Sequence, residues 1–319
     1  MLNLPYTYTF YSSMSKFSLF VQCFVAAFFL YFTSTAQILV SRNYLINPFT
    51  DSSSVGKVFA NTGFLAEFSR GYGSTADAHA WNAKIAGYFE VYRFNPNLSF
   101  VFVSAHEVTA DLYNNLYFNP KGAIWHETFA LYYQRKKFVL EAGITHRCRH
   151  NIDNADTDGS LDGNINFQNI TYRVLIVNAP YLQIFQPKIR LHNKVTLQLA
   201  LRGEYFWYSY DSRYPYIDDS QSWATLRGAL QAQAGLTWQL NKTFGLYGKA
   251  WVQNMIFDNT KVFTQNARCE TGLLIRGEKA HLQVFGSYEY FFDDYSRHIP
   301  RSSGVVFVGA RIGGKVFGW

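Results

Sequence analysis

The chain has few charged residues and few long apolar runs. Only 16% of its 319 residues are charged, and its mean hydropathy is −0.12. Several helical membrane spans of about twenty apolar residues each would raise the mean hydropathy well above zero, which excludes a helical membrane protein. The net charge is +7, but the basic residues are scattered and form no Lys/Arg cluster. This pattern predicts that the protein does not bind nucleic acid.

One long apolar run lies near the N-terminus, from Phe17 to Phe32. Lys16 precedes it, and three small residues, 34 to 36, follow it. This order predicts a cleavable signal peptide over residues 1 to 36, with Ala36 the last residue removed, and therefore export. A transmembrane anchor is the alternative, but a run of about sixteen residues is short for a membrane span.

Cysteine is also scarce. Cys23 lies within the apolar run and leaves with the signal peptide, so Cys148 and Cys269 remain. Two cysteines in an exported protein ordinarily form a disulfide. The strands predicted below place them far apart, with both side chains pointing outward, whereas a disulfide requires Cα atoms within about 7 Å. We therefore predict two free thiols.

Aromatic residues, by contrast, are abundant, at 18% of the chain. They occur in segments where apolar and polar residues alternate. In residues 80 to 92, for example, Trp81, Ile85 and Phe89 share one face and Lys84 lies on the other. Alternation with a period of two predicts β-strands with one apolar face, in either a soluble sandwich or a barrel.

The connections favour the barrel. Short turns near residues 95–97, 135–137, 192–194, 241–243 and 278–279 alternate with longer polar connections. Short turns on one rim and long loops on the other are typical of outer-membrane barrels. We predict an N-terminal periplasmic segment over residues 37 to 57 and a transmembrane antiparallel β-barrel of about twelve strands over residues 58 to 319. The predicted strands are 59–70, 80–93, 98–110, 123–134, 138–150, 168–190, 195–210, 222–239, 244–257, 266–276, 281–292 and 304–314.

Two details refine this barrel. The sixth strand contains Pro180 and Pro187, which predicts a break at a position that the sequence does not fix. The strand faces opposite the apolar ones hold charges of both signs, which can pair across a barrel of this size and fill it, so a wide pore is not implied. These predicted lumen residues are Lys84, Glu90, Arg173, Arg202, Glu204, Arg227, Arg268, Glu270, Arg276, Glu289 and Arg311.

The C-terminus gives a prediction about partners. The last strand is followed by Trp319. A terminal aromatic residue after an alternating strand resembles the signal by which the outer-membrane insertion machinery recognises its substrates. That machinery and the outer-membrane lipids are therefore the expected partners.

The segment from Glu141 to Asp153 contains the candidate catalytic residues. Phe138, Leu140, Ala142 and Ile144 have the lipid-facing parity, and strict alternation puts His146, Cys148 and His150 on the same outward face. Two imidazoles and a thiol at the level of the lipid head groups are unusual for a barrel wall. A thiol beside an imidazole forms a reactive thiolate.

The stretch Gly143 to Cys148 resembles the outer membrane phospholipase A family, twelve-stranded barrels with an outward Gly-x-x-His-x-Ser sequence. Lipid A deacylases, smaller barrels, also use an outward His-x-Ser pair. The resemblance implies lipid acyl hydrolysis with Cys148 in place of the serine nucleophile, His146 as general base and a supporting Asn on the next strand, at Asn169 or with Gln168 instead. Glu127 is a further orienting candidate, because pairing across the turn at 135–137 places it near His146.

Metal binding is a second interpretation of this region. His146, Cys148 and His150 include metal-ligand types, but three alternate residues of one straight strand rarely reach the same ion. The following connection carries Asp153, Asp156 and Asp158, whose carboxylates suit Ca²⁺, although a solvated acidic loop is the preferred explanation.

Two functions remain open from the sequence. The first is an outer-leaflet lipid acyl hydrolase or acyltransferase that uses the His146 and Cys148 pair. The second is a non-enzymatic outer-membrane barrel that serves as a scaffold, adhesin or narrow channel, with loop aromatics such as Tyr113, Tyr117, Tyr214, Tyr216 and Tyr295 binding an external partner.

Overall fold

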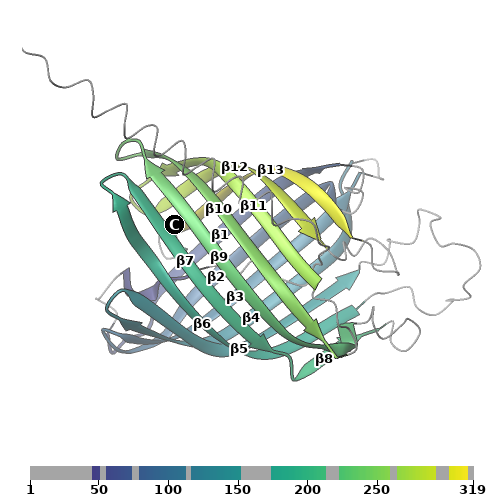
Figure 1. The fold of residues 1–319 in the computed structure, drawn as a ribbon, viewed down its shortest axis with the longest axis horizontal. Coiled ribbons are helices and arrows are strands. Elements are labelled where there is room, and N and C mark those ends of the chain that lie inside the picture. Colours follow the sequence, from purple (N-terminus) through teal and green to yellow (C-terminus); the bar gives the residue numbers. More distant parts are fainter. Residues whose placement is uncertain are drawn as a thin grey trace, which may run out of the picture. The chain divides into compact units, whose positions relative to one another are not determined.

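The computed structural model describes residues 45–50, 55–73, 79–112, 116–151, 174–212, 223–258, 264–291 and 302–314. They form one antiparallel sheet, which Figure 1 shows, and two 3-10 turns, η1 (Pro48–Thr50) and η5 (Trp223–Thr225). The strands are β1 (Val58–Tyr72), β2 (Trp81–Asn95), β3 (Leu98–Asp111), β4 (Asn119–Arg135), β5 (Phe138–Asn151), β6 (Val174–His192), β7 (Val195–Tyr205), β8 (Tyr208–Asp211), β9 (Leu226–Gln239), β10 (Phe244–Phe257), β11 (Thr264–Arg276), β12 (Ala280–Phe291) and β13 (Ser303–Gly314).

The sheet closes on itself. β1 pairs with β13, and β5 pairs with β6, so neither side of the sheet is left as an edge. β7 and β8 both pair with β6 and are separated by Phe206 and Trp207, so they form one interrupted strand. Twelve strands therefore surround the barrel, and the predicted strand count and fold class are confirmed.

Alternation along the strands sorts the side chains between two environments. On β1, for example, Phe64 and Phe68 are exposed on the outside, whereas Glu67 and Ser69 are buried inside. The closed ladder satisfies the backbone polar groups, and the apolar outer surface suits lipid, as an outer-membrane barrel requires. Within the described residues, no helix is long and apolar enough to cross a membrane.

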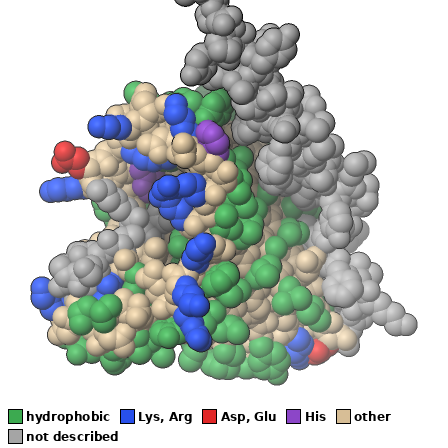
Figure 2. Space-filling view, turned by 60° about the vertical axis from the view of Figure 1, so that its left-hand side comes forward, with side chains coloured by type: hydrophobic (Ala, Val, Ile, Leu, Met, Phe, Trp, Pro, Cys, Tyr) green, Lys and Arg blue, Asp and Glu red, His purple; other side chains and the backbone are tan. Residues whose placement is uncertain are grey.

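One end of the barrel carries the short turns, and most of these contain a basic residue. The turns after β2, β4 and β6 have two residues each, which keeps the paired strands in tight register. Exposed basic residues gather at this end (Figure 2): Arg135, Lys136, Lys137, Lys188, Arg190, Lys194, Lys242 and Lys279. The longer connections join the strands at the opposite end, as predicted.

The predicted break in the sixth strand is instead a pair of irregularities. β6 continues through both prolines. Pro187 lies within a register shift between Gln186 and Ile189, and Pro180 lies where β6 passes from β7 to β8 as its partner. Both prolines coincide with irregular points of the ladder, where a missing N–H donor is tolerated.

Ion pairs link four neighbouring strands on the lumen side of the wall. Arg311 on β13 contacts Glu67 on β1 at 2.6 Å and Glu270 on β11 at 2.8 Å. Arg268 on β11 contacts Glu270 and lies 2.9 Å from Glu289 on β12. All five side chains are buried, so the predicted pairing of lumen charges is confirmed for this group.

Arg227 does not belong to the lumen network. It lies at a bulge in the β9–β10 ladder, between Leu226 and Gly228, and forms a 2.6 Å ion pair with Asp258 in which both side chains are 43% exposed. The bulge breaks the alternation on which its predicted inward orientation depended. Arg173 lies outside the described residues.

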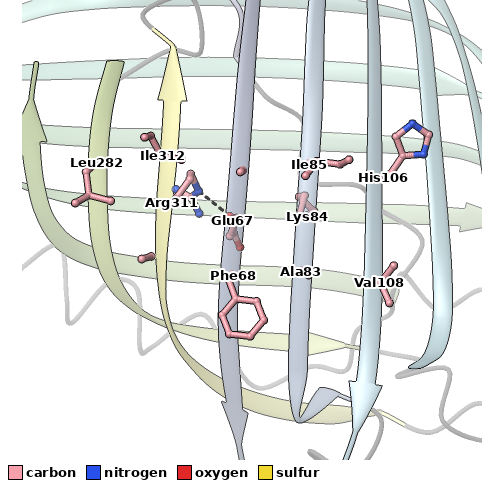
Figure 3. A pocket seen from close by; sticks show the side chains of 12 residues that line it. Glu67, Phe68, Ala83, Lys84, Ile85, His106, Val108, Leu282, Arg311 and Ile312 are labelled. Atoms are coloured by element: carbon pink, nitrogen blue, oxygen red, sulfur yellow. Dashed lines mark hydrogen bonds and ion pairs between the residues drawn. The ribbon is translucent and has the colours of Figure 1, made fainter. Parts of the chain in front are cut away.

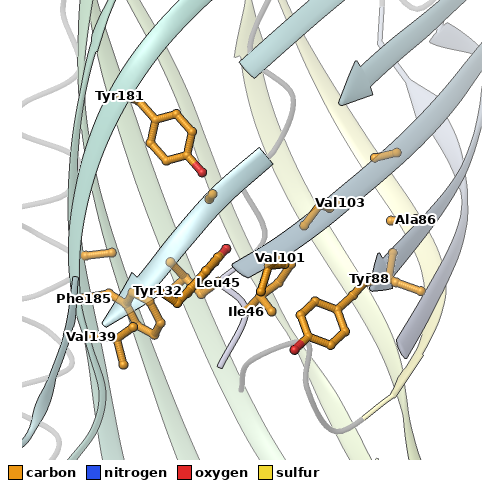
Figure 4. Close-up of a cluster of buried hydrophobic side chains, with 14 residues drawn as sticks. Leu45, Ile46, Ala86, Tyr88, Val101, Val103, Tyr132, Val139, Tyr181 and Phe185 are labelled. Atoms are coloured by element: carbon orange, nitrogen blue, oxygen red, sulfur yellow. The ribbon is translucent and has the colours of Figure 1, made fainter. Parts of the chain in front are cut away.

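The N-terminal segment packs inside the short-turn end of the barrel. Leu45 and Ile46 are buried in a cluster with lumen residues such as Tyr132, Val139 and Phe185 (Figure 4). Arg93 from β2 donates a hydrogen bond to the carbonyl oxygen of Pro48, and its guanidinium lies 5.2 Å from the centre of the Phe49 ring. Part of the predicted periplasmic segment, residues 37 to 57, thus fills the lumen.

The lumen network predicts a large stability effect for a single substitution. Arg311→Leu leaves Glu67 and Glu270 buried without this partner and should lower the free energy of unfolding by about 3–5 kcal/mol. Arg227→Leu removes an ion pair of the same length that is exposed, and should cost about 1 kcal/mol or less. Urea unfolding in detergent, followed by gel mobility without heating, measures both. Equal effects would contradict a stabilising lumen network.

The N-terminal plug predicts a conductance change. Replacing Leu45 and Ile46 together by serine should loosen the plug and raise the ion conductance of the barrel in planar bilayers. The matched control replaces Val55 and Val58, which are exposed, by serine and should leave the conductance unchanged. A high conductance in the wild-type protein would contradict a filled lumen.

Candidate functional site

β5 presents its histidines and cysteine on the outer surface, as predicted. Leu140, Ala142 and Ile144 are exposed on the outward face, and His146, Cys148 and His150 continue the same parity. The intervening residues Glu141, Thr145, Arg147 and Arg149 are buried on the lumen side. β5 ends at Asn151, so the polar outward residues lie near the end of the barrel that carries the long connections.

The lumen side of the same strand is fixed by a buried ion pair. Arg147 donates two hydrogen bonds to Glu204 on β7, at 2.9 and 2.5 Å. Arg202 donates a third to this carboxylate at 2.7 Å and lies over the ring of Tyr181. A bidentate, buried pair of this kind holds planar groups in one geometry. The wall behind His146 and Cys148 is therefore rigidly connected across β5, β6 and β7.

Gly143 allows β5 to lie close to β4. A Cβ atom at this position would be 2.4 Å from the carbonyl oxygen of Phe129 and 2.8 Å from the Cβ of Ala130. Any larger residue would push the two strands apart. The glycine of the Gly-x-x-His sequence thus allows the close β4–β5 pairing in which His146 lies opposite Glu127.

His146 forms a hydrogen bond to an asparagine on the next strand. Its Nδ1 lies 2.7 Å from Oδ1 of Asn178 on β6, its direct cross-strand partner. Because an amide oxygen only accepts hydrogen bonds, Nδ1 carries a proton, and in the neutral ring Nε2 keeps a free lone pair. The imidazole is thereby held in the tautomer that a general base needs.

Sequence reasoning missed Asn178. The predicted orienting residues, Gln168 and Asn169, lie outside the described residues. Because the connection between β5 and β6 is long, the sequence does not fix the register between these two strands. The cross-strand partner of His146 could therefore not be identified from the sequence. One signal was available: Asn178 is a polar residue at a lipid-facing position in the apolar stretch from Val174 to Leu182.

Glu127 lies beside His146 on the other side. It is the direct cross-strand partner of His146 on β4 and faces outward, as the predicted pairing across the 135–137 turn required. Its own partner on β3 is Ser104. A row of outward polar residues therefore crosses four strands: Ser104, Glu127, His146 and Asn178.

The adjacent row contains the thiol. His106 on β3, Trp125 on β4, Cys148 on β5 and Ile176 on β6 are successive cross-strand partners. Cys148 is only 9% exposed although it points outward. Trp125 makes edge contacts with the rings of His106 and His150. We call Ser104, His106, Glu127, His146, Cys148 and Asn178 the outer polar cluster.

The nucleophile and base of the predicted pair are neighbours that do not touch in this structure. Among the described residues, no hydrogen bond joins Cys148 to His146. Alternate residues of a strand lie about 6.5–7 Å apart at Cα, within reach of side-chain rotation. Catalytic hydrogen bonds are often long without substrate and tighten when it binds.

Metal binding finds no support in the part of the chain that the structure describes. No group of three or more His, Cys, Asp and Glu side chains there is arranged to hold an ion. His146 is instead engaged by Asn178, and the ring of His150 contacts Trp125. The acidic candidates Asp153, Asp156 and Asp158 lie outside the described residues.

Several solved structures resemble the chain. Outer membrane phospholipase A from Escherichia coli is 12% identical over 81% of this chain and 93% of that one, with a TM-score of 0.45. The calcium-bound outer membrane phospholipase dimer of Salmonella typhi is also 12% identical, covering 81% of this chain and 91% of that one, with a TM-score of 0.43. The NanC porin is 9% identical over 77% of this chain and 98% of that one, with a TM-score of 0.42. No family model and no curated protein matches the chain.

Both cysteines are free in the structure, which confirms the prediction of no disulfide. Their accessibility differs, because Cys148 is buried and Cys269 on β11 is partly exposed. In the folded protein an uncharged maleimide should modify Cys269 faster than Cys148. Trp125→Ala should accelerate modification of Cys148 severalfold, whereas Trp238→Ala, at another exposed outward tryptophan, should not. If neither thiol reacts after denaturation without reductant, the strand arrangement is wrong.

Proposed function

We propose that the protein is an outer-membrane acyl hydrolase or acyltransferase that acts on lipid esters of the outer leaflet. One observation carries the proposal: the 2.7 Å contact between His146 and Asn178 on the lipid-facing surface, next to the thiol of Cys148. A polar pair in contact with lipid is costly for a barrel wall. Nucleophilic catalysis by a thiol needs an oriented imidazole beside it, and this function explains why the His146–Asn178 pair lies there.

In the proposed reaction Cys148 is the nucleophile and His146 the general base. Nε2 of His146 takes the thiol proton, and the thiolate attacks the carbonyl carbon of the ester to form a thioester. The same proton goes to the departing alcohol. Water, or a hydroxyl group of a second lipid, then gives its proton to Nε2 of His146 and attacks the thioester carbonyl. The C–S bond breaks, the Cys148 thiolate takes that proton back, and the fatty acid or a new ester is released.

Two neighbouring residues support the base. Asn178 holds the imidazole in the Nδ1-protonated tautomer, the role that the resemblance to the phospholipase family assigns to an asparagine on the next strand. Glu127, the cross-strand partner of His146 on β4, faces outward beside it. Both act as positioning residues.

The cellular location of the protein is part of the same proposal. An outward-facing site meets its substrate only when the barrel is inserted in the outer membrane. The proposal therefore includes export through a cleaved signal peptide of residues 1 to 36 and insertion directed by the strand that precedes Trp319. Asp153, Asp156 and Asp158 make calcium dependence worth measuring in the same experiments.

The test is fatty acid release by the mature protein in vesicles, with phospholipid and lipid A offered separately and with or without Ca²⁺. Cys148→Ala and His146→Ala should each reduce the rate by about 10²–10⁴-fold, the usual contribution of a positioned acid-base group. The double variant should be no slower than either single one, because the two residues act as a unit. Asn178→Ala should cause a smaller loss.

Two further variants sharpen the result. Cys148→Ser should retain part of the activity, because a serine hydroxyl can use the same base. Cys269→Ala removes the other outward thiol and should leave the rate unchanged. Equal activity in the wild type and Cys148→Ala would reject the nucleophile. No release from either lipid would favour the non-enzymatic scaffold, adhesin or narrow channel.

A further inference from the structure

A second polar pair lies on the outer surface, two strands away from Cys148. The hydroxyl oxygen of Ser104 and Nε2 of His106, both on β3, are 3.0 Å apart. Both side chains are half-buried and have the outward parity. Whichever tautomer His106 adopts, this hydrogen bond uses only one of the two polar hydrogens of the pair, so one donor remains for a ligand.

His106 also forms the polar end of an apolar groove on the barrel surface. The groove has a volume of about 510 Å³ and crosses β3, β2, β1, β13 and β12 (Figure 3). Its floor is made of small residues, Ala66, Ala83 and Ala310. Large apolar side chains border it, namely Phe68, Ile85, Val108, Leu282 and Ile312.

The groove is lined by a short row of cross-strand partners, Val108, Ala83, Phe68 and Ala310, and by a longer row beside it. His106, Ile85, Ala66, Ile312 and Leu282 are paired in succession, so the longer row spans four strand spacings. At about 4.8 Å per spacing its length is about 19 Å. Because barrel strands tilt by about 35–45°, a row at right angles to them crosses the membrane obliquely.

The groove runs from the polar cluster toward the short-turn end. His106 lies well inside β3, which begins at its short turn at Leu98. Leu282, at the other end of the row, lies only two residues after Ala280, where β12 begins at its short turn. A chain that starts at His106 therefore descends from the level of the outer polar cluster toward the opposite rim.

We infer that this groove binds one acyl chain of a membrane phospholipid, with the ester of that chain at Ser104 and His106. The width set by three alanines suits a single chain, and apart from His106 the outward-facing side chains that line the groove are apolar. Glu67, Lys84 and Arg311, which also line it, are buried on the lumen face of the wall. The donor that remains on the Ser104–His106 pair binds the ester carbonyl oxygen. This site is distinct from Cys148 and does not depend on hydrolysis.

Charge beside the pair selects the head group. Glu127, the cross-strand partner of Ser104, faces outward and brings a carboxylate to this end of the groove. A carboxylate attracts an ammonium group and repels an anionic head group. The preferred ligand is accordingly phosphatidylethanolamine, ahead of phosphatidylglycerol with the same acyl chains.

Native mass spectrometry of the Cys148→Ala protein in detergent tests the site without turnover. With phosphatidylethanolamine added, we expect one bound lipid. Ala66→Phe and Ala310→Phe should each reduce the bound fraction about tenfold, because a phenyl ring takes the place of several methylene groups and their contacts. Ser104→Ala and His106→Ala should weaken binding, and Glu127→Gln should reduce the preference over phosphatidylglycerol.

The matched control is Ala232→Phe, an outward alanine on β9 that lies outside the groove. It should bind lipid as the parent does, and heat-modifiable gel mobility should show that every variant is folded. Equal binding by the parent and both groove-filling variants would overturn the inference, and so would equal loss in Ala232→Phe. Binding of lipid A in place of phosphatidylethanolamine would also overturn it.

Discussion

The closed ladder of backbone hydrogen bonds is the constraint on which the rest of this structure depends. Lipid offers no partners for N–H and C=O groups, so a sheet that spans it must close, and its outer face must be apolar. The charged residues of the strands are then driven inward, where Arg311, Glu67 and Glu270 satisfy one another. At the short-turn end, Leu45 and Ile46 pack against apolar lumen residues.

The outer polar cluster departs from this constraint. Six polar residues on β3 to β6 face outward on a surface that is otherwise rich in exposed apolar side chains. Two of their contacts, His146 to Asn178 and Ser104 to His106, reduce the cost by pairing polar atoms with each other. Each contact joins residues that the backbone ladder of the wall already connects. The proposed function and the proposed lipid site both rest on this departure.

Periodicity made most of the fold predictable, because a period of two survives in nearly every strand and the turns contain recognisable polar residues. The parity of His146, Cys148 and Glu127 followed from it. The register between two strands joined by a long connection does not follow from periodicity, so Asn178 was not predicted. Arg227 was misassigned because a bulge shifts its strand by one residue. Ser104 and His106 were missed because a lone Ser and His in a strand look like ordinary polar positions until the groove beside them is visible.

The central claim is that the outer polar cluster faces lipid at the level of the ester bonds. A nitroxide spin label on Cys148, in a protein with Cys269→Ala, measures this directly by comparing collisions with oxygen, which dissolves in lipid, and with a water-soluble nickel complex. We expect high oxygen accessibility with intermediate access to nickel, and a deeper position for a label at Ala142. Access to nickel alone, or a label at Cys148 as deep as one at Ala142, would contradict the account.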